Sequence, residues 1–344
     1  MKCDGSRLAM YILSFAAMVR RLMLSLGRTC AVVIEFRSSG FNDKYRLIDC
    51  TSRIGLRSNH KEYKELLYGK FDQLIATETR QKKEYMKCHI PEAIHMDFHI
   101  ATYPNEYSSY ALYPPKIFQR YARILGINID DHLIFYGRGA LGGMLVPSTI
   151  AWLFKCYGHD RVSVLDGGLR CWEHEIGEVT DRLPTIKYGN WKASDICKNR
   201  VVTFDELVAR DSSGLNLFGN IDAVNFLDAR TRGQFEGTEP TGLDHHKVKG
   251  SHIGGARNTP IVEVVSNEGT LKPASEIRKW IEECGFEKGK PVITSCNRGL
   301  QASLLAMVLE YADETLKPRV YCGSIKELEL RDPEIISSGH VFIP

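Results

Sequence analysis

The residues best suited to chemistry lie in a short loop that begins at Cys296. The stretch Pro291–Ser295 has the character of a buried strand, and Leu300–Ala312 that of an apolar helix. Backbone N–H groups converge at a strand-to-helix turn and bind anions there. The sequence therefore predicts an activated, anion-binding cysteine. The loop residues expected to form the site after Cys296 are Asn297, Arg298, Gly299, Leu300, Gln301 and Ala302.

This loop must act as a unit to keep the thiol ionised. A free thiol with a pKa of ~8.5 is about 3% thiolate at pH 7. Lowering that pKa by about two units requires a preference of roughly 2.7 kcal/mol for the anion. A helix dipole supplies only ~0.3–1 kcal/mol. We therefore expect several N–H···S hydrogen bonds, with Arg298 nearby, to supply the rest.

The spacing of the loop disfavours a cysteine phosphatase. Such enzymes place an arginine six positions after the cysteine, and that position is Ala302 here. A loop this tight suits a sulfur atom carried on the cysteine better than a tetrahedral phosphate.

Short strands alternate with helical patterns along the whole chain, which is typical of an α/β fold with parallel sheets. Strong strand candidates are His132–Tyr136, Arg161–Leu165, Asn225–Asp228, Pro291–Ser295 and Arg319–Cys322, and long apolar helices are expected at Val146–Tyr157 and Leu300–Ala312.

The two halves of the chain echo each other. His89–Ala93 resembles His252–Ala256, and equal spacing from a preceding glycine puts Gly137 opposite Cys296. We expect two modules, each a parallel sheet with helices on both faces. The predicted division is an N-terminal extension at 1–44, a non-catalytic domain at 45–179, a linker at 180–199 and a catalytic domain at 200–344.

The N-terminal extension lacks acidic residues from Gly5 to Ile34 but contains arginines. Its apolar run Leu8–Val19 is too short for the ~20 residues that span a bilayer, so no membrane span is expected. The segment is compatible with a mitochondrial presequence or with an ordinary extension. The expected location is therefore mitochondrial or cytoplasmic.

The overall composition narrows the class of partner. The 344 residues include 45 Lys and Arg against 42 Asp and Glu, a formal net charge of +3. This balance gives no support for nucleic-acid binding. The ten cysteines are scattered without a C-x-x-C pair, which indicates mostly free thiols in a reducing compartment.

The chain resembles the tandem-domain rhodanese family of thiosulfate and 3-mercaptopyruvate sulfurtransferases. The resemblance runs from about Tyr45 to Gly339. Besides the Cys296 loop, it is carried by His89–Ala93, Arg161–Gly168 with Trp172, Asp228–Pro240, His252–Pro260 and Gly323–Glu327, although Ile325 stands where the family usually has Trp.

The resemblance implies persulfide transfer by the second domain alone, with no metal or organic cofactor. The Cys296 thiolate would take the outer sulfur of a donor and pass it to a thiophilic acceptor. The expected partners are a small sulfur donor and a cyanide or thiol acceptor, with a thioredoxin-like reductant as a further candidate.

Some substrate positions of the family are changed. Gln234 replaces an arginine that contacts the anionic donor, and the arginine that mercaptopyruvate enzymes carry after Glu239-Pro240 is absent. Arg298 resembles the basic residue of thiosulfate enzymes, where mercaptopyruvate enzymes have Ser. The expected substrate-binding residues are Arg298, Arg230 and Gln234.

Two alternative functions remain open at this stage. The lost arginines favour a binding or regulatory protein with weak turnover. The stretch Gly137–Gly142 matches G-x-G-x-x-G after a strand, with Asp166 ending the next strand, which is the form of a nicotinamide-binding fingerprint. The equivalent loop in the second half of the chain contains Cys296 in place of the first glycine. A nicotinamide-dependent oxidoreductase is therefore the weaker of the interpretations.

Overall fold

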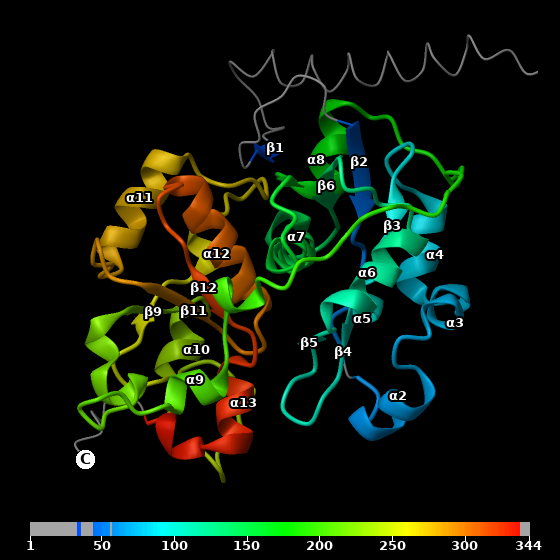
Figure 1. Cartoon of the computed structure of the whole chain (residues 1–344). Helices are drawn as coiled ribbons and strands as arrows, with labels where there is room; N and C mark the ends of the chain where they lie inside the picture. The colour runs from blue at the N-terminus through cyan, green and yellow to red at the C-terminus, as the bar shows by residue number, and fades with distance from the viewer. Residues whose placement is uncertain (1–32, 36–43, 56, 338–344) are drawn as a thin grey trace, which may run out of the picture.

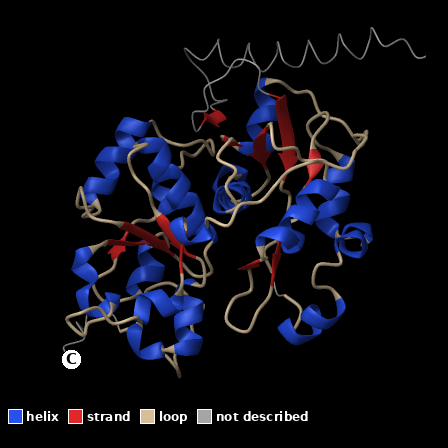
Figure 2. Ribbon diagram, viewed as in Figure 1, coloured by secondary structure: helices blue, strands red, loops and turns tan. Residues whose placement is uncertain are grey.

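The computed structural model describes residues 33–35, 44–55 and 57–337. Within them, two five-stranded sheets lie in separate modules, each surrounded by helices (Figures 1 and 2). Most of the N-terminal extension, including its presequence-like run, lies outside the described residues. No helix in the described part is long and apolar enough to cross a bilayer.

The first sheet has the strand order β1-β7-β6-β2-β3. Its strands are parallel except β1, which pairs antiparallel with β7 at the edge. The predicted parallel sheet is therefore confirmed, and β1 adds one antiparallel strand at its edge. The bounds are β1 Val33–Glu35, β2 Lys44–Asp49, β3 Ile94–His95, β6 Asp131–Tyr136 and β7 Val162–Leu165.

The second sheet repeats this arrangement in the order β10-β9-β11-β12-β8, and all its pairs are parallel. The chain passes from β9 out to β10 and returns on the other side of β9 to form β11. Such a reversal opens a crevice at the carboxyl ends of the strands, where α/β proteins bind ligands. The bounds are β8 Val201–Val202, β9 Asn225–Asp228, β10 Arg257–Asn258, β11 Val292–Ser295 and β12 Arg319–Tyr321.

Helices cover both faces of each sheet, as the sequence predicts. In the first module they are α2 His60–Leu66, α3 Phe71–Ala76, α4 Arg80–Lys87, α5 Phe98–Ala101, α6 Pro115–Ile124, α7 Leu145–Cys156 and α8 Gly168–Glu175, with a small hairpin of β4 Thr102–Tyr103 and β5 Ala111–Leu112. In the second they are α9 Phe204–Val208, α10 Arg232–Glu236, α11 Ala274–Glu283, α12 Leu300–Ala312 and α13 Ser324–Arg331. Short 3-10 turns complete the chain at Leu141–Gly143, Cys197–Asn199, Leu217–Ala223, Ile261–Val264 and Pro333–Ile335.

Successive side chains of a strand point to opposite faces, and the second sheet buries both. Phe226 and Ile293 belong to one apolar cluster together with residues of α9 and α13. Leu227 and Val292 belong to the other, together with residues of α11 and α12. Burial on both faces explains why these strands read as continuous apolar runs in the sequence. The five strands and two long helices predicted from such runs are confirmed to within one residue at each end.

The two modules meet along α7 and α12, which lie next to each other in the middle of the molecule (Figure 1). Both helices are buried over nearly their whole length, as expected of helices that are apolar all round. The ammonium group of Lys155 in α7 lies 2.5 Å from a carboxylate oxygen of Glu310 in α12. Arg200 pairs with the other oxygen of Glu310. This carboxylate therefore joins the two modules through paired, buried charge.

The segment at 180–199 contains no helix or strand apart from a bridge at Thr180 and the 3-10 turn at its end. The segment is attached to the first module: Trp191 is buried, and its backbone N–H donates to Ile127. The predicted domain bounds stay a prediction.

Candidate active site

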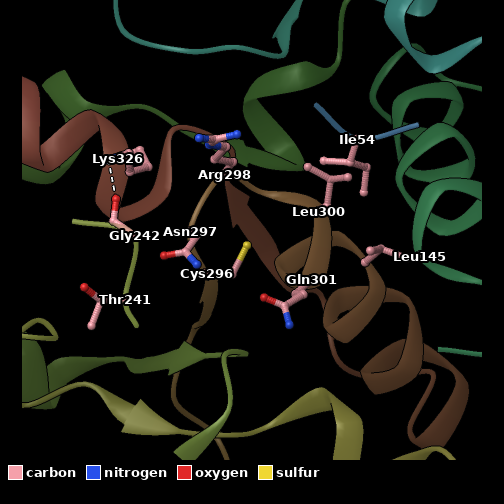
Figure 3. A pocket seen from close by; sticks show the side chains of 10 residues that line it. All are labelled: Ile54, Leu145, Thr241, Gly242, Cys296, Asn297, Arg298, Leu300, Gln301 and Lys326. Carbon is pink, nitrogen blue, oxygen red and sulfur yellow. Dashed lines mark hydrogen bonds between the residues drawn. The ribbon is translucent and has the colours of Figure 1, made fainter. Parts of the chain in front are cut away.

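Cys296 is the first residue after β11, the central strand of the second sheet. Ser295, just before it, is paired in register with Asp228 at the end of β9. The cysteine therefore lies at the crevice between these two strand ends. Its side chain is only 2% exposed, and its sulfur faces a cavity (Figure 3).

Gly299 turns the chain from the loop into α12. Its φ angle of 89° lies in the left-handed region, and an added Cβ would come within 2.6 Å of the Cys322 carbonyl oxygen. A side chain at this position is excluded by both strain and space. The Gly299 N–H donates to the Cys296 sulfur over 3.1 Å. The glycine is therefore required for the turn and also supplies a donor to the thiol.

Fewer donors reach the sulfur than the sequence analysis expects. Among the described residues, Gly299 is the only backbone amide that donates to the Cys296 sulfur. The Ser324 hydroxyl lies 4.0 Å from the same sulfur, but its single proton is much closer to the Tyr321 carbonyl, at 2.8 Å. The physical reason is that a bare thiol occupies only the base of the loop, whereas the first N–H groups of α12 lie further along it.

Ser324 is a residue that the sequence analysis does not place in the site. Its φ angle of 52° is unusual for a residue other than glycine. Its hydroxyl accepts from the Cys296 N–H at 3.1 Å and can donate to the Tyr321 carbonyl at 2.8 Å. The signal was available, because the Gly323–Glu327 stretch carries part of the family resemblance.

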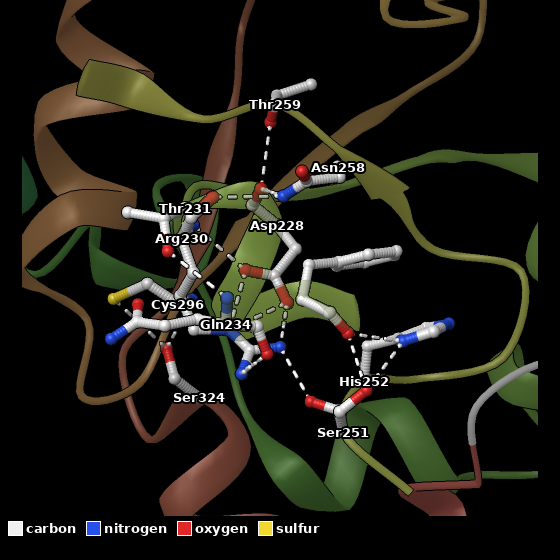
Figure 4. A network of polar contacts seen from close by, with 11 residues as sticks. Asp228, Arg230, Thr231, Gln234, Ser251, His252, Asn258, Thr259, Cys296 and Ser324 are labelled. Carbon is white, nitrogen blue, oxygen red and sulfur yellow. Dashed lines mark hydrogen bonds and ion pairs between the residues drawn. The ribbon is translucent and has the colours of Figure 1, made fainter. Parts of the chain in front are cut away.

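Arg230 is buried beside β9 and does not line the cavity. Its guanidinium is 0% exposed and makes hydrogen bonds of 2.6–3.1 Å to the Asp228 carboxylate (Figure 4). It also donates to the Ser251 carbonyl at 3.0 Å. A guanidinium that is paired with a buried carboxylate stabilises the end of the strand. Its N–H groups are then not available to bind a substrate.

Gln234 does not line the cavity either. Its side-chain amide donates to the Pro240 carbonyl at 3.4 Å, and its backbone carbonyl accepts from the Arg230 guanidinium at 3.4 Å. The structure therefore separates the three expected substrate-binding residues. Only Arg298 lies with Cys296.

The cavity in front of Cys296 has a volume of about 250 Å³. In Figure 3 apolar side chains lie on one side of Cys296, and Lys326 and Gly242 on the other. Of the predicted loop, all but Gly299 and Ala302 line it. The complete lining is Ile54, Leu145, Thr241, Gly242, Cys296, Asn297, Arg298, Leu300, Gln301 and Lys326.

Several lining residues have no local signal in the sequence. Ile54 follows β2 and Leu145 begins α7, so both come from the first module. Only the packing of the two modules brings them to the thiol. Thr241 and Gly242 occupy the stretch where the resemblance notes a missing arginine.

Arg298 lies close enough to Tyr110 of the first module for its charge to act on the tyrosine hydroxyl. Burial raises the pKa of the Tyr110 hydroxyl, and the positive charge of Arg298 opposes that rise. Tyr110 lies just before β5, in the hairpin that projects toward the second module (Figure 1). The first module therefore contributes a neighbour of Arg298 as well as the lining residues Ile54 and Leu145.

His89 lies in the first module, outside the cavity. It is fully buried, with Nδ1 2.9 Å from the Tyr85 carbonyl oxygen and its ring 4.3 Å from the ring of Tyr85. In the described part of the chain, no group of three or more His, Cys, Asp or Glu side chains could hold a metal ion.

Comparisons with known proteins agree on one family. A family model described as the rhodanese-like domain matches residues 59–175. The Caenorhabditis elegans protein named "Putative thiosulfate sulfurtransferase mpst-1" is 44% identical over 301 residues, which cover 87% of this chain and 92% of that protein. The 3-mercaptopyruvate sulfurtransferase of Mus musculus is 28% identical over 262 residues, 75% of this chain and 83% of the mouse protein.

A solved structure shows the same fold. SseA from Escherichia coli, whose structure is described under the rhodanese fold and 3-mercaptopyruvate sulfotransferases, matches with a TM-score of 0.62 at 23% identity. The match covers 81% of this chain and 92% of SseA.

Proposed function

Since this chain belongs to the tandem-domain rhodanese family of sulfurtransferases, we propose that it moves a sulfane sulfur from thiosulfate or 3-mercaptopyruvate to a thiophilic acceptor through a persulfide on Cys296. The observation that carries the proposal is the position of the Cys296 sulfur. It faces a cavity of small-molecule size and accepts a hydrogen bond from the Gly299 amide. That donor stabilises a sulfur anion more than a neutral thiol.

The proposed reaction has two displacements. The Cys296 thiolate attacks the outer sulfur of thiosulfate, the sulfur–sulfur bond of the donor breaks, and sulfite leaves with the bonding electron pair. The cysteine now carries one additional sulfur. Cyanide or a thiolate then attacks that outer sulfur and leaves as thiocyanate or a persulfide, which returns the Cys296 thiolate.

The persulfide intermediate requires donors that the bare thiol does not use. The first N–H groups of α12, from Leu300 to Ala302, have no partners within the helix. They lie at the positive end of a 13-residue helix. A sulfur added to Cys296 extends toward these groups, so the loop suits the persulfide anion better than the resting enzyme.

We propose thiosulfate as the preferred donor because Arg298 lines the cavity. Thiosulfate carries two negative charges, whereas 3-mercaptopyruvate carries one on its carboxylate.

The proposal includes a non-catalytic domain at 45–179, a linker at 180–199, a catalytic domain at 200–344 and a mitochondrial or cytoplasmic location. A thioredoxin-like reductant is a proposed acceptor.

Mass spectrometry of the whole chain tests the persulfide directly. After thiosulfate treatment and removal of the donor, we expect the mass to rise by one sulfur atom, located on the peptide that contains Cys296. Cyanide should remove that mass and release thiocyanate. Cys296→Ser should show neither result while keeping the wild-type circular dichroism spectrum.

Cys284→Ser is the matched control, because Cys284 is a partly exposed cysteine outside the cavity. It should retain wild-type turnover. Turnover that survives in Cys296→Ser would refute the proposal. A chain that binds thiosulfate but never gains the sulfur would support the binding or regulatory alternative instead.

A further inference from the structure

We propose that Lys326 is a specificity-determining residue that binds the anionic head group of the sulfur donor. This inference rests on the proposed function and names how its donor is held. Ten residues line the cavity, and the two that carry a full charge, Arg298 and Lys326, are both cations. The cavity therefore attracts a small anion from two sides and presents it to the Cys296 sulfur.

The position of Lys326 is fixed to the catalytic loop through the backbone. Lys326 is the third residue of α13, and its N–H donates to the Asn297 carbonyl at 3.2 Å. The preceding N–H, of Ile325, donates to the Cys296 carbonyl at 3.2 Å. Two consecutive hydrogen bonds thus fix the start of α13 against the residues that carry the thiol. Such attachment to a rigid loop is what a substrate-positioning cation requires.

The ammonium group of Lys326 is oriented by two acceptors. Its Nζ donates to the Gly242 carbonyl at 2.8 Å and to the Glu329 carboxylate. An ammonium has three N–H donors, so one is left for a ligand. The Lys326 side chain is 26% exposed, whereas that of Glu329 is 4% exposed and does not line the cavity. Glu329 therefore orients the Lys326 ammonium group from outside the cavity and leaves the cavity side of the lysine open to a ligand.

Glu329 is itself held in place by a backbone hydrogen bond from the Asp244 N–H. Lys326 and Glu329 together connect α13 to the segment at 242–244. A purely structural role for Lys326 would consist of this connection alone. The two roles predict different results, because a structural connection does not depend on the charge of the molecule that enters the cavity.

The ligand class follows from the lining. Two cations at a cavity of about 250 Å³ suit a small donor whose oxyanion lies next to its transferable sulfur. The sulfonate end of thiosulfate and the carboxylate of 3-mercaptopyruvate share this chemistry. We expect Lys326 to contact those oxygens while Cys296 faces the sulfur.

Two alkylating reagents test the charge preference without sulfur transfer. Iodoacetate and iodoacetamide react at the same carbon, but only iodoacetate is an anion. For the full-length Lys326→Met variant we expect the ratio of their rates at Cys296 to fall about tenfold, the effect of losing one charge-assisted hydrogen bond. Lys326→Arg should recover most of the ratio because it restores the charge.

Steady-state kinetics with thiosulfate form the second arm. Lys326→Met should raise KM about tenfold and leave kcat within about twofold, since the lysine binds the donor and takes no part in the displacement. The control is Lys247→Met. Lys247 also faces an acid in this region, Asp244, but is 54% exposed and does not line the cavity. It should leave both measurements unchanged.

The inference is overturned if Lys326→Met slows both reagents equally, or if Lys326→Arg is as impaired as Lys326→Met. Either result would mean that the lysine only supports the fold. The failure of the proposed function is distinguishable, because it would appear in the wild-type protein as a missing persulfide while the alkylation ratio stays intact.

Discussion

The two strand-end loops at 137–143 and 296–302 occupy equivalent places and do different work. Tyr136 pairs with Asp49 in the first sheet as Ser295 pairs with Asp228 in the second, so Gly137 is the structural counterpart of Cys296. The equivalence extends to hydrogen bonding. Leu169 donates to the Gly137 carbonyl, as Ile325 does to the Cys296 carbonyl.

The main difference is the source of the arginine beside each buried aspartate. In the second module Arg230 lies between the Asp228 carboxylate and the Ser251 carbonyl. In the first module Arg138 lies between the Asp49 carboxylate and the Cys88 carbonyl. The same kind of site is therefore filled from two different loops.

This difference decides which loop can hold a reactive group. Arg138 belongs to the loop that follows β6, so its side chain crosses the crevice to reach Asp49. Arg230 belongs to the loop after β9, so the loop that follows β11 is not needed to neutralise Asp228. One loop is used for charge compensation, and the other carries a thiol that faces a cavity.

The glycines of the first loop serve close packing. An added Cβ at Gly142 would lie 1.7 Å from the Gly269 carbonyl oxygen, and one at Gly143 would lie 2.6 Å from that of Gly137. Contacts this short leave room only for glycine. Packing therefore accounts for Gly142, the last glycine of the G-x-G-x-x-G match, and for Gly143 just after it, without a dinucleotide.

Moving the thiol to the first loop should give the largest effect. We expect Gly137→Cys in the Cys296→Ser background to have no sulfurtransferase activity. An added Cβ at Gly137 would meet the Gly143 carbonyl oxygen at 3.0 Å and Pro147 at 3.1 Å, and no serine hydroxyl stands where Gly168 replaces Ser324. Thiocyanate formation is the measurement. Any turnover above the Cys296→Ser background would show that the two loops are interchangeable.

Removing each arginine compares the two buried aspartates. Arg230→Met should destabilise the fold by about 3–5 kcal/mol, because it leaves Asp228 charged and buried. Arg138→Met should cost less, since the Arg138 side chain is 25% exposed whereas that of Arg230 is 0% exposed. Urea unfolding of both variants measures the difference. Equal losses would contradict this distinction between the modules.

The first residue after β7 is Asp166, and the first residue after the equivalent strand β12 is Cys322. The two side chains differ in how their protonation affects the stability of the fold as the pH changes. Burial raises the pKa of Asp166 to about 7 and that of Cys322 to about 12. The folded chain therefore keeps a proton on Asp166 that the unfolded chain releases near pH 4. The stability that this gives is complete below about pH 4 and is lost as the pH rises through about 7.

Asp166→Asn should flatten this dependence and leave the variant roughly 2–4 kcal/mol more stable than the wild type at pH 8. The asparagine carbonyl can still accept from the Leu271 N–H, which lies 2.8 Å from Asp166. Urea unfolding at pH 5 and pH 8 measures the slope. Parallel slopes in variant and wild type would rule out this carboxyl as the cause.

Removing Arg298 should give the smallest effect, because Lys326 remains in the cavity. Arg298 lies two positions after Cys296. The equivalent position in the first loop is Gly139, two positions after Gly137. Arg298→Ala should lower kcat/KM for thiosulfate about tenfold more than for 3-mercaptopyruvate, through the lost second charge contact. The ratio of the two donors is the measurement. An unchanged ratio would place Arg298 outside donor binding.

Local patterns in the sequence predict most elements of the fold. Strands buried on both faces and the two apolar helices leave continuous runs of apolar residues, which explains the agreement at Asn225–Asp228 and Leu300–Ala312. The antiparallel edge strand Val33–Glu35 leaves no such signal, because three residues are too few to show a period.

The candidate site is only partly local. Gly299, Arg298 and the α12 N-terminus adjoin Cys296 in the chain, so spacing alone predicts them. The sequence cannot show that Arg230 turns toward Asp228. A guanidinium can point to a substrate or to a carboxylate, and the nearest buried charge decides which.

The amino-acid sequence by itself determined the α/β class, the loop that carries the thiol and the correspondence between the halves, because each depends on neighbours in the chain. The tertiary structure alone decided which charges face the cavity. Lys326 reaches it through the packing of α13 on the cysteine loop, and Ile54 and Leu145 reach it through the contact between modules. Such contacts join residues that are far apart in the chain, so no local spacing records them.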